Sequence, residues 1–256
     1  MSTVSLAARD SATMLRRNLR HALRYPSMSL STAAMPIIFM LLFVYVFGST
    51  LGAGIGGGRY VDYVAPGVIL MTAAAGAIST SVSVCMDMTE GIVARFRTMA
   101  ISRVSVLTGH VVGSMIQTAF GMVLVTGVAL LIGFRPSAGP AEWAAAIGVL
   151  LMLTLALTWL AVAFGLVSDR PETASNLPLP LTLLPFLGSG FVPTGSMPAG
   201  VRQFAEYQPF TPITETLRGL LMGTPIGHSA LIAVAWCAAI ALGGYLWAKT
   251  RFNRAR

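Results

Sequence analysis

The sequence predicts an all-α integral membrane protein with six transmembrane helices, and three observations carry that prediction. Only 10% of the residues are charged, whereas a soluble globular domain carries about 25%. Six uncharged stretches are each long enough to supply the roughly 20 apolar residues that cross about 30 Å of hydrocarbon. The basic residues gather in alternate segments between these stretches, as expected for a chain that is threaded through a membrane.

We expect the whole chain, residues 1–256, to form a single transmembrane domain, in which residues 30–248 hold the six spans. In chain order they are predicted at 30–50, 64–86, 107–132, 143–167, 174–192 and 229–248. Residues 1–25 precede this 30–248 domain and a short tail, 249–256, follows it. The first apolar run is too long for the core of a cleavable signal peptide, so we expect it to remain as an anchor.

Orientation follows from the positive-inside rule. With the N-terminus inside, 13 of the 17 basic residues lie in inner segments, and the outer segments hold only Arg59, Arg135, Arg202 and Arg218. Four outer acids balance those four, so the whole net charge of +8 lies inside. The sequence therefore predicts a multi-pass protein of the cell (plasma) membrane with both termini cytoplasmic, and its basic charge requires no nucleic-acid partner.

The N-terminal segment has the pattern of an amphipathic helix. Leu15, Leu19 and Leu23 recur every four residues, and the other faces carry basic side chains that include Arg16, Arg17 and Arg20. Such a helix lies in the headgroup region of the bilayer. We expect an interfacial helix over 1–25 on the cytoplasmic side; the alternative is a disordered basic tail.

The fifth span and the outer segment after it are unusual. Pro178, Pro180 and Pro185 free backbone carbonyls that neighbouring protein must satisfy, which predicts a kinked span packed inside the bundle. The segment that follows is too long and too apolar for a plain loop. Its apolar residues form two short amphipathic pieces separated by Pro209 and Pro212, and we expect re-entrant outer helices between spans five and six.

The possible nucleotide-binding and metal-binding motifs all lack the surrounding residues that such sites require. Residues 52–57, "GAGIGG", match a dinucleotide-binding pattern but lack the strand before it and the acid about 20 residues later. The only lysine, Lys249, has no phosphate-loop glycine before it, and Cys85 and Cys237 have no metal-ligand spacing. The sequence therefore predicts no catalytic residue, metal or cofactor, and any ATP-driven work must come from a partner.

Residues 90–110, "EGIVARFRTMAISRVSVLTGH", place a burst of charge between the second and third spans. In a helix, Ile92, Phe96 and Met99 would form one apolar stripe. The stripe favours a short helix on the inner membrane face, and the alternative is the solvated basic loop found in every multispan protein.

Two stretches and the overall layout resemble the permease subunit of ABC-2-type exporters, especially the daunorubicin/doxorubicin-resistance branch. "EGIVARFRTMAISRVSVLTGHVV" (90–112) is similar to the family's inner segment between spans two and three, although Ala100 stands where that family often has proline. "FVPTGSMPAGVRQFAEYQPFTPITETLRGLLMG" (191–223) is similar to its outer region, and is the more specific match.

The resemblance implies roles and partners. Glu90, Arg95, Phe96 and Arg97 would lie in a coupling helix that docks on a P-loop ATP-binding subunit. A second permease subunit, in a homodimer or heterodimer, would complete the exporter of an amphipathic drug, natural product or lipid. The outer re-entrant region would include Pro193, Pro209, Pro212 and Arg218. Two alternatives are a polysaccharide or lipid-carrier permease of the same type and a membrane anchor or assembly protein without transport activity.

Overall fold

The computed structural model describes residues 26–55, 58–89 and 103–254, and all of the elements in these ranges are helices. Four are long and apolar enough to cross a membrane: α4 (Tyr60–Thr89), α6 (Arg103–Leu131), α7 (Pro140–Val167) and α12 (Ser229–Arg254). They overlap the predicted second, third, fourth and sixth spans and extend them by a few residues. The prediction of an all-α integral membrane fold is confirmed.

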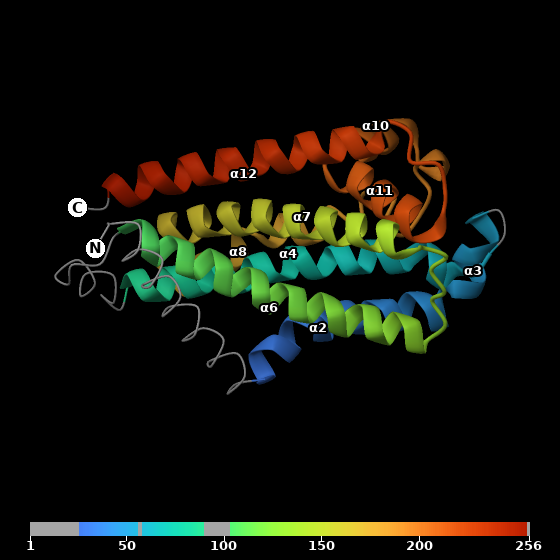
Figure 1. Ribbon diagram of the computed structural model, residues 1–256, viewed down its shortest axis with the longest axis horizontal. Coiled ribbons are helices and arrows are strands. Elements are labelled where there is room, and N and C mark those ends of the chain that lie inside the picture. The colour runs from blue at the N-terminus through green and yellow to red at the C-terminus, as the bar shows by residue number, and fades with distance from the viewer. Residues whose placement is uncertain (1–25, 56–57, 90–102, 255–256) are drawn as a thin grey trace.

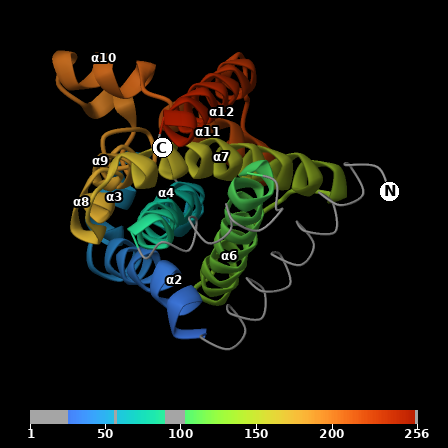
Figure 2. The ribbon, with the colours of Figure 1, turned by 90° about the vertical axis from the view of Figure 1, so that its left-hand side faces the viewer.

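Helix α4 lies at the centre of the bundle. Helices α2, α6 and α7 and the short helix α8 (Pro171–Asn176) pack around it, as the end-on view shows (Figure 2). Nineteen of the 30 residues of α4 are buried, and several are small: Gly67, Ala73, Ala74, Gly76 and Ala77. Small side chains allow helix backbones to approach closely, which is the main source of helix packing in a membrane. Helix α12 instead lies on the outside of α7 (Figure 1).

The first span is bent. Helix α2 (Pro26–Leu41) continues as a π-helix, η1 (Leu42–Val46), before the chain turns by 70° into α3 (Gly48–Gly52). An inserted π-turn interrupts the regular hydrogen-bond ladder and is a common cause of helix kinks. The predicted span 30–50 is therefore a bent pair of helices, which is long and apolar enough to cross a membrane only when its two parts are taken together.

The predicted fifth span, 174–192, is broken as its prolines require. Helix α8 is followed by α9 (Leu179–Leu183) and then by turns through Phe191. This broken segment, which we define as residues 168–191, lies antiparallel to α4: the Cys85 thiol donates to the Ser168 carbonyl (3.3 Å), and the Tyr60 hydroxyl donates to the Phe191 carbonyl (2.9 Å).

Between Tyr60 and Cys85, α4 rises roughly 37 Å at about 1.5 Å per residue, more than the hydrocarbon thickness. The broken segment therefore follows a full membrane depth without forming a continuous helix. Four continuous spans and one bent pair meet the criteria of length and composition, so the count of six stays a prediction.

Two short helices follow the broken segment, as predicted for the outer region. A 3-10 turn, η3 (Thr194–Ser196), leads to α10 (Ala199–Tyr207) and α11 (Phe210–Met222). Helix α11 is largely buried between α4, α7 and α12, whereas α10 projects from the bundle with Phe204 and Tyr207 exposed (Figures 1 and 2). We call this end of the bundle the α11 end and the opposite one the terminal end.

Candidate functional site

The predicted functional residues fall into two groups. Glu90, Arg95, Phe96 and Arg97 of the coupling helix and Arg16, Arg17 and Arg20 of the interfacial helix lie outside the described residues, so their roles stay predictions. The outer residues Pro193, Pro209, Pro212 and Arg218 are all described, and all four lie at the α11 end.

The three prolines stand where helices begin. Pro193 directly precedes η3, Pro209 directly precedes α11, and Pro212 lies in the first turn of α11. Proline is tolerated there because the first backbone amides of a helix have no partner within the helix. These residues thus set where the outer helices start.

Side chains in α11 and just before it form hydrogen bonds with backbone groups of the broken segment. The Gln208 amide donates to the Leu184 carbonyl (3.2 Å), and the Thr211 hydroxyl accepts from the Ser189 amide (3.2 Å). The Gln208 carbonyl also accepts from the Phe210 amide (3.1 Å) at the start of α11. Irregular backbone at membrane depth is tolerated only when protein or water satisfies its polar groups, and here side chains do so.

Arg218 makes the strongest of these contacts. Its Nη2 donates to the Ser189 carbonyl (2.7 Å) and to the Tyr63 carbonyl (3.1 Å), and its guanidinium lies 3.8 Å from the centre of the Tyr63 ring. Burial lowers the pKa of Arg218 from its ordinary value, while Tyr63 and Glu215 act in the opposite direction. Arginine stays charged even so, and one cation joins α4, the broken segment and α11.

A close approach of two backbones holds the broken segment against α4. A Cβ placed on Gly67 would lie 2.6 Å from the carbonyl oxygen of Gly190 and 2.8 Å from its Cα. On the other side of the segment, a Cβ on Gly188 would meet the side chains of Gln208 and Thr211. Glycine is required at position 67, because a side chain there would meet backbone, whereas a side chain at position 188 would displace the ends of the Gln208 and Thr211 side chains.

Aromatic rings join the same segment to the first span. Phe186 and Phe191 are stacked with their centroids 4.4 Å apart, Phe43 of the π-helix lies 4.6 Å from Phe191, and Phe39 lies 5.2 Å from Phe186. These ring contacts pack the bent pair of helices at the start of the chain's described residues against the broken segment.

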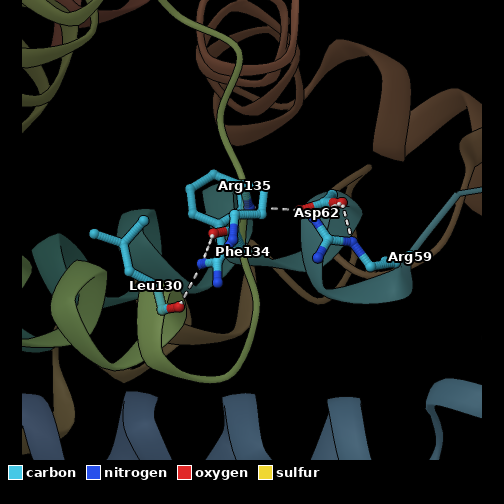
Figure 3. A network of polar contacts seen from close by, with 5 residues as sticks. All are labelled: Arg59, Asp62, Leu130, Phe134 and Arg135. Carbon is cyan, nitrogen blue, oxygen red and sulfur yellow. Dashed lines mark hydrogen bonds and ion pairs between the residues drawn. The ribbon is translucent and has the colours of Figure 1, made fainter.

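A polar network ties the connection between α6 and α7 to the start of α4 (Figure 3). The Asp62 carboxylate accepts from the Arg135 backbone amide (3.0 Å) and forms an ion pair with Arg59 (3.0 Å). The Arg135 guanidinium in turn donates to the Leu130 carbonyl (2.9 Å) at the end of α6. The same connection contacts α11, because the Ser137 backbone amide donates to the Leu221 carbonyl (2.9 Å). Helix α12 also contacts α11, because the Ser229 hydroxyl donates to the Glu215 carboxylate (2.9 Å).

At the terminal end, one pair links the two helices that flank the predicted coupling segment. His110 of α6 lies 3.0 Å from Asp87 of α4. Nothing in the sequence relates the two residues, which lie 23 positions apart with no common periodicity. Asp87 precedes and His110 follows residues 90–102, which lie outside the described ranges.

The sequence also missed Tyr60, Asp62 and Gln208. Asp62 and Tyr60 read as ordinary residues at a membrane boundary, and only the fold reveals that each contacts a segment more than 70 residues away. Gln208 carried the clearest available signal, since it is an uncharged polar residue directly before the proline that precedes α11. All three were missed because each has a backbone atom of a distant segment among its partners, and such contacts leave no pattern in the sequence.

The contacts at the α11 end join segments that are distant in the sequence. In the described ranges no group of three His, Cys, Asp or Glu side chains is placed to hold a metal ion. Several polar side chains at the α11 end donate to, or accept from, main-chain groups of other segments: Asp62, Gln208, Thr211 and Arg218. The site therefore holds segments in position, and what it controls is the relative placement of α4, α11 and the broken segment.

Comparisons with known proteins agree with this description. The profile of the family described as ABC-2 type transporter matches residues 10–222. The chain is 26% identical over 202 residues to the daunorubicin resistance ABC transporter permease protein DrrB1 of Streptomyces coeruleorubidus, covering 78% of this chain and 70% of that protein. It is 23% identical over 206 residues to the probable doxorubicin resistance ABC transporter permease protein DrrC of Mycobacterium tuberculosis, covering 80% and 74%. The chain belongs to the ABC-2 type transporter family and is a multi-pass transport permease of that type.

Proposed function

We propose that the chain is the membrane-spanning subunit of an ATP-driven exporter that moves an amphipathic drug, natural product or lipid out of the cell together with a separate ATP-binding subunit. The observation that carries the proposal is the broken segment, 168–191, which follows a membrane depth without a continuous helix. Irregular backbone occurs at that depth only where it is enclosed by protein or lines a path. A simple anchor has no need of such a segment, whereas a transporter does. The names of the relatives support a drug as cargo.

The ATP-binding subunit is expected to dock on residues 90–102. The first test is co-purification of the chain with a separately encoded P-loop ATPase from the same cells. Arg97→Glu is expected to weaken that complex or its transport activity while the chain still inserts into the membrane. The matched control is Arg251→Glu, which makes the same charge change near the end of α12. Equal loss in both variants, or none in either, would argue against docking at residues 90–102.

A second permease subunit is expected to cover the outer face of the broken segment. Leu177, Leu179, Leu183 and Leu187 are exposed there, beside exposed residues of α2 that include Met35 and Ile38. Prolines leave backbone groups in this region without helical partners, and lipid cannot satisfy them. A protein surface is therefore a better cover than lipid for this face.

Photo-crosslinking tests the position of that subunit. A photoreactive residue in place of Leu183, which is 58% exposed, is expected to join two permease chains. The control is the same residue in place of Leu231 on α12, which is 75% exposed and is expected to face lipid. Crosslinks between permease chains from position 231 and none from position 183 would place the partner on the other side of the bundle.

A further inference from the structure

Arg218 contacts backbone atoms of two segments that are not covalently close. Its acceptors are the carbonyl of Tyr63 in the first turn of α4 and the carbonyl of Ser189 in the broken segment, 3.1 and 2.7 Å from Nη2. Nε also lies 3.3 Å from the Tyr63 carbonyl. Among the described residues no carboxylate lies within ion-pair distance of this guanidinium. Its charge is thus directed at main-chain oxygens of two separate segments rather than at a carboxylate.

The other side of α11 is tied to different elements. Glu215, one turn before Arg218, accepts from the Ser229 hydroxyl at the start of α12 (2.9 Å), and the Leu221 carbonyl accepts from the Ser137 amide (2.9 Å). A movement of α11 with α12 would therefore have to break the contacts of Arg218 with α4 and the broken segment, together with the hydrogen bond between Thr211 and Ser189. Hydrogen bonds from a charged donor are stronger than neutral ones, yet the donor carries several N–H groups that exchange partners readily.

We propose that Arg218 is a positioning residue that holds the α11 end of the bundle closed by joining Tyr63 and Ser189, and that its release from Ser189 accompanies the opening of this end during transport. The proposal rests on the proposed function for its second half only. The first half concerns the resting protein and is tested without any transport measurement.

Ser189 offers a direct reporter of this contact. Its side chain is buried, and its hydroxyl has no hydrogen-bond partner, so Ser189→Cys removes no interaction of the described structure. The native thiols are also buried: Cys85 is replaced by serine, and Cys237 is replaced by serine in the reporter chain but kept in a separate control chain. The control thiol lies on α12 against α7, away from Arg218.

The experiment measures the rate at which a bulky charged maleimide labels position 189 in the purified complex with its ATP-binding subunit. Arg218→Gln removes the cation that both carbonyls accept from, and we expect labelling to rise about ten- to hundredfold. Arg218→Lys keeps the charge but presents a compact ammonium in place of the planar fork, so we expect a smaller rise. Tyr63→Leu keeps the carbonyl and removes only the ring under the guanidinium, and should give the smallest rise.

Two further readouts separate positioning from a loss of structure. With Arg218 intact, adding ATP should raise labelling at position 189, and Arg218→Gln should abolish that response because the site is already open. ATP hydrolysis by the complex should persist in Arg218→Gln while transport falls. The control thiol at position 237 should label at the same slow rate in every variant.

The outcomes divide cleanly. Unchanged labelling at position 189 in Arg218→Gln would overturn the proposal, and so would equal acceleration at position 237, which would indicate general loosening. If Arg218→Gln does not fold, the Arg218→Lys and Tyr63→Leu variants carry the same test in weaker form. Absence of ATP-driven transport by the unaltered complex would instead contradict the proposed function, and would leave the labelling result to be judged on its own.

Discussion

Helices α4 and α12 are nearly equal in hydropathy and opposite in position. Their most apolar stretches have mean hydropathies of 1.8 and 1.9, yet 72% of that stretch is buried in α4 and only 17% in α12. In a soluble protein, a difference in burial of this size would reflect a difference in hydropathy between the two helices. In a bilayer lipid is as apolar as a protein core, so hydropathy does not decide which helix is inside.

What differs between the two helices is the placement of small residues. Helix α4 buries glycine, alanine, serine and threonine on several of its faces, and these faces pack against different neighbouring helices. Helix α12 is buried along one stripe, Ala233, Cys237, Gly244 and Ala248, and exposes Leu231, Leu246 and Trp247 elsewhere. Close backbone approach, rather than apolar area, therefore organises this bundle.

The largest expected effect comes from closing the gap beside α4. Gly67→Leu would drive a side chain into the backbone of Gly190, which has no side chain to move aside, and should destabilise the protein by about 3 kcal/mol or more. Thermal unfolding in detergent measures the loss. The control is Gly148→Leu on α7, where a Cβ meets nothing within 4 Å. Comparable stability of the two variants would mean that α4 and the broken segment are not in close contact.

A smaller effect is expected at the seam of α12. A Cβ on Gly244 would lie 2.7 Å from the backbone nitrogen of Leu160, whereas a Cβ on the adjacent Gly243 meets nothing within 4 Å. Gly244→Leu should cost about 1–3 kcal/mol, because α12 has room to shift outward, and Gly243→Leu should cost little. The same thermal assay applies. If Gly243→Leu were the more damaging of the two, the observed face of α12 would be wrong.

Tyr60→Phe tests a single hydrogen bond of α4. The loss of the hydroxyl leaves the buried Phe191 carbonyl without this donor and should cost about 1 kcal/mol, the usual scale for such bonds within membranes. Tyr245→Phe makes the same chemical change on α12, where the Tyr245 ring packs edge-on against Trp159 and the residue is 38% exposed. We expect the melting temperature to fall only for position 60. An equal fall for both would remove the distinction between the two helices.

The smallest effect is expected on the lipid side of α12. Leu231→Ala shortens a side chain that is 75% exposed and should change stability by less than about 0.5 kcal/mol. The melting temperature of the purified complex, rather than of the isolated chain, is the informative quantity. A large loss there would show that protein, not lipid, covers this face.

Much of the fold was predictable because the length and polarity of each span can be seen directly in the sequence. The long helices, the break at Pro178, Pro180 and Pro185, and the two outer helices all follow from local signals. The π-helix at Leu42–Val46 was not predictable, because residues 42–46 contain no proline or glycine, and Gly48 by itself did not indicate the 70° corner. The contacts of Arg218, Asp62 and Tyr60 were not predictable either, since their acceptors or donors include main-chain atoms of distant segments.

The most direct test of the account is transport by the complete complex in sealed vesicles. The chain, reconstituted with its ATP-binding subunit, is supplied with ATP and a fluorescent amphipathic drug, and uptake into inside-out vesicles is followed over time. We predict uptake that requires ATP and both subunits, and that disappears when the phosphate-loop lysine of the ATP-binding subunit is replaced. Equal uptake by the chain alone, or ATP-independent uptake by the complex, would contradict the account.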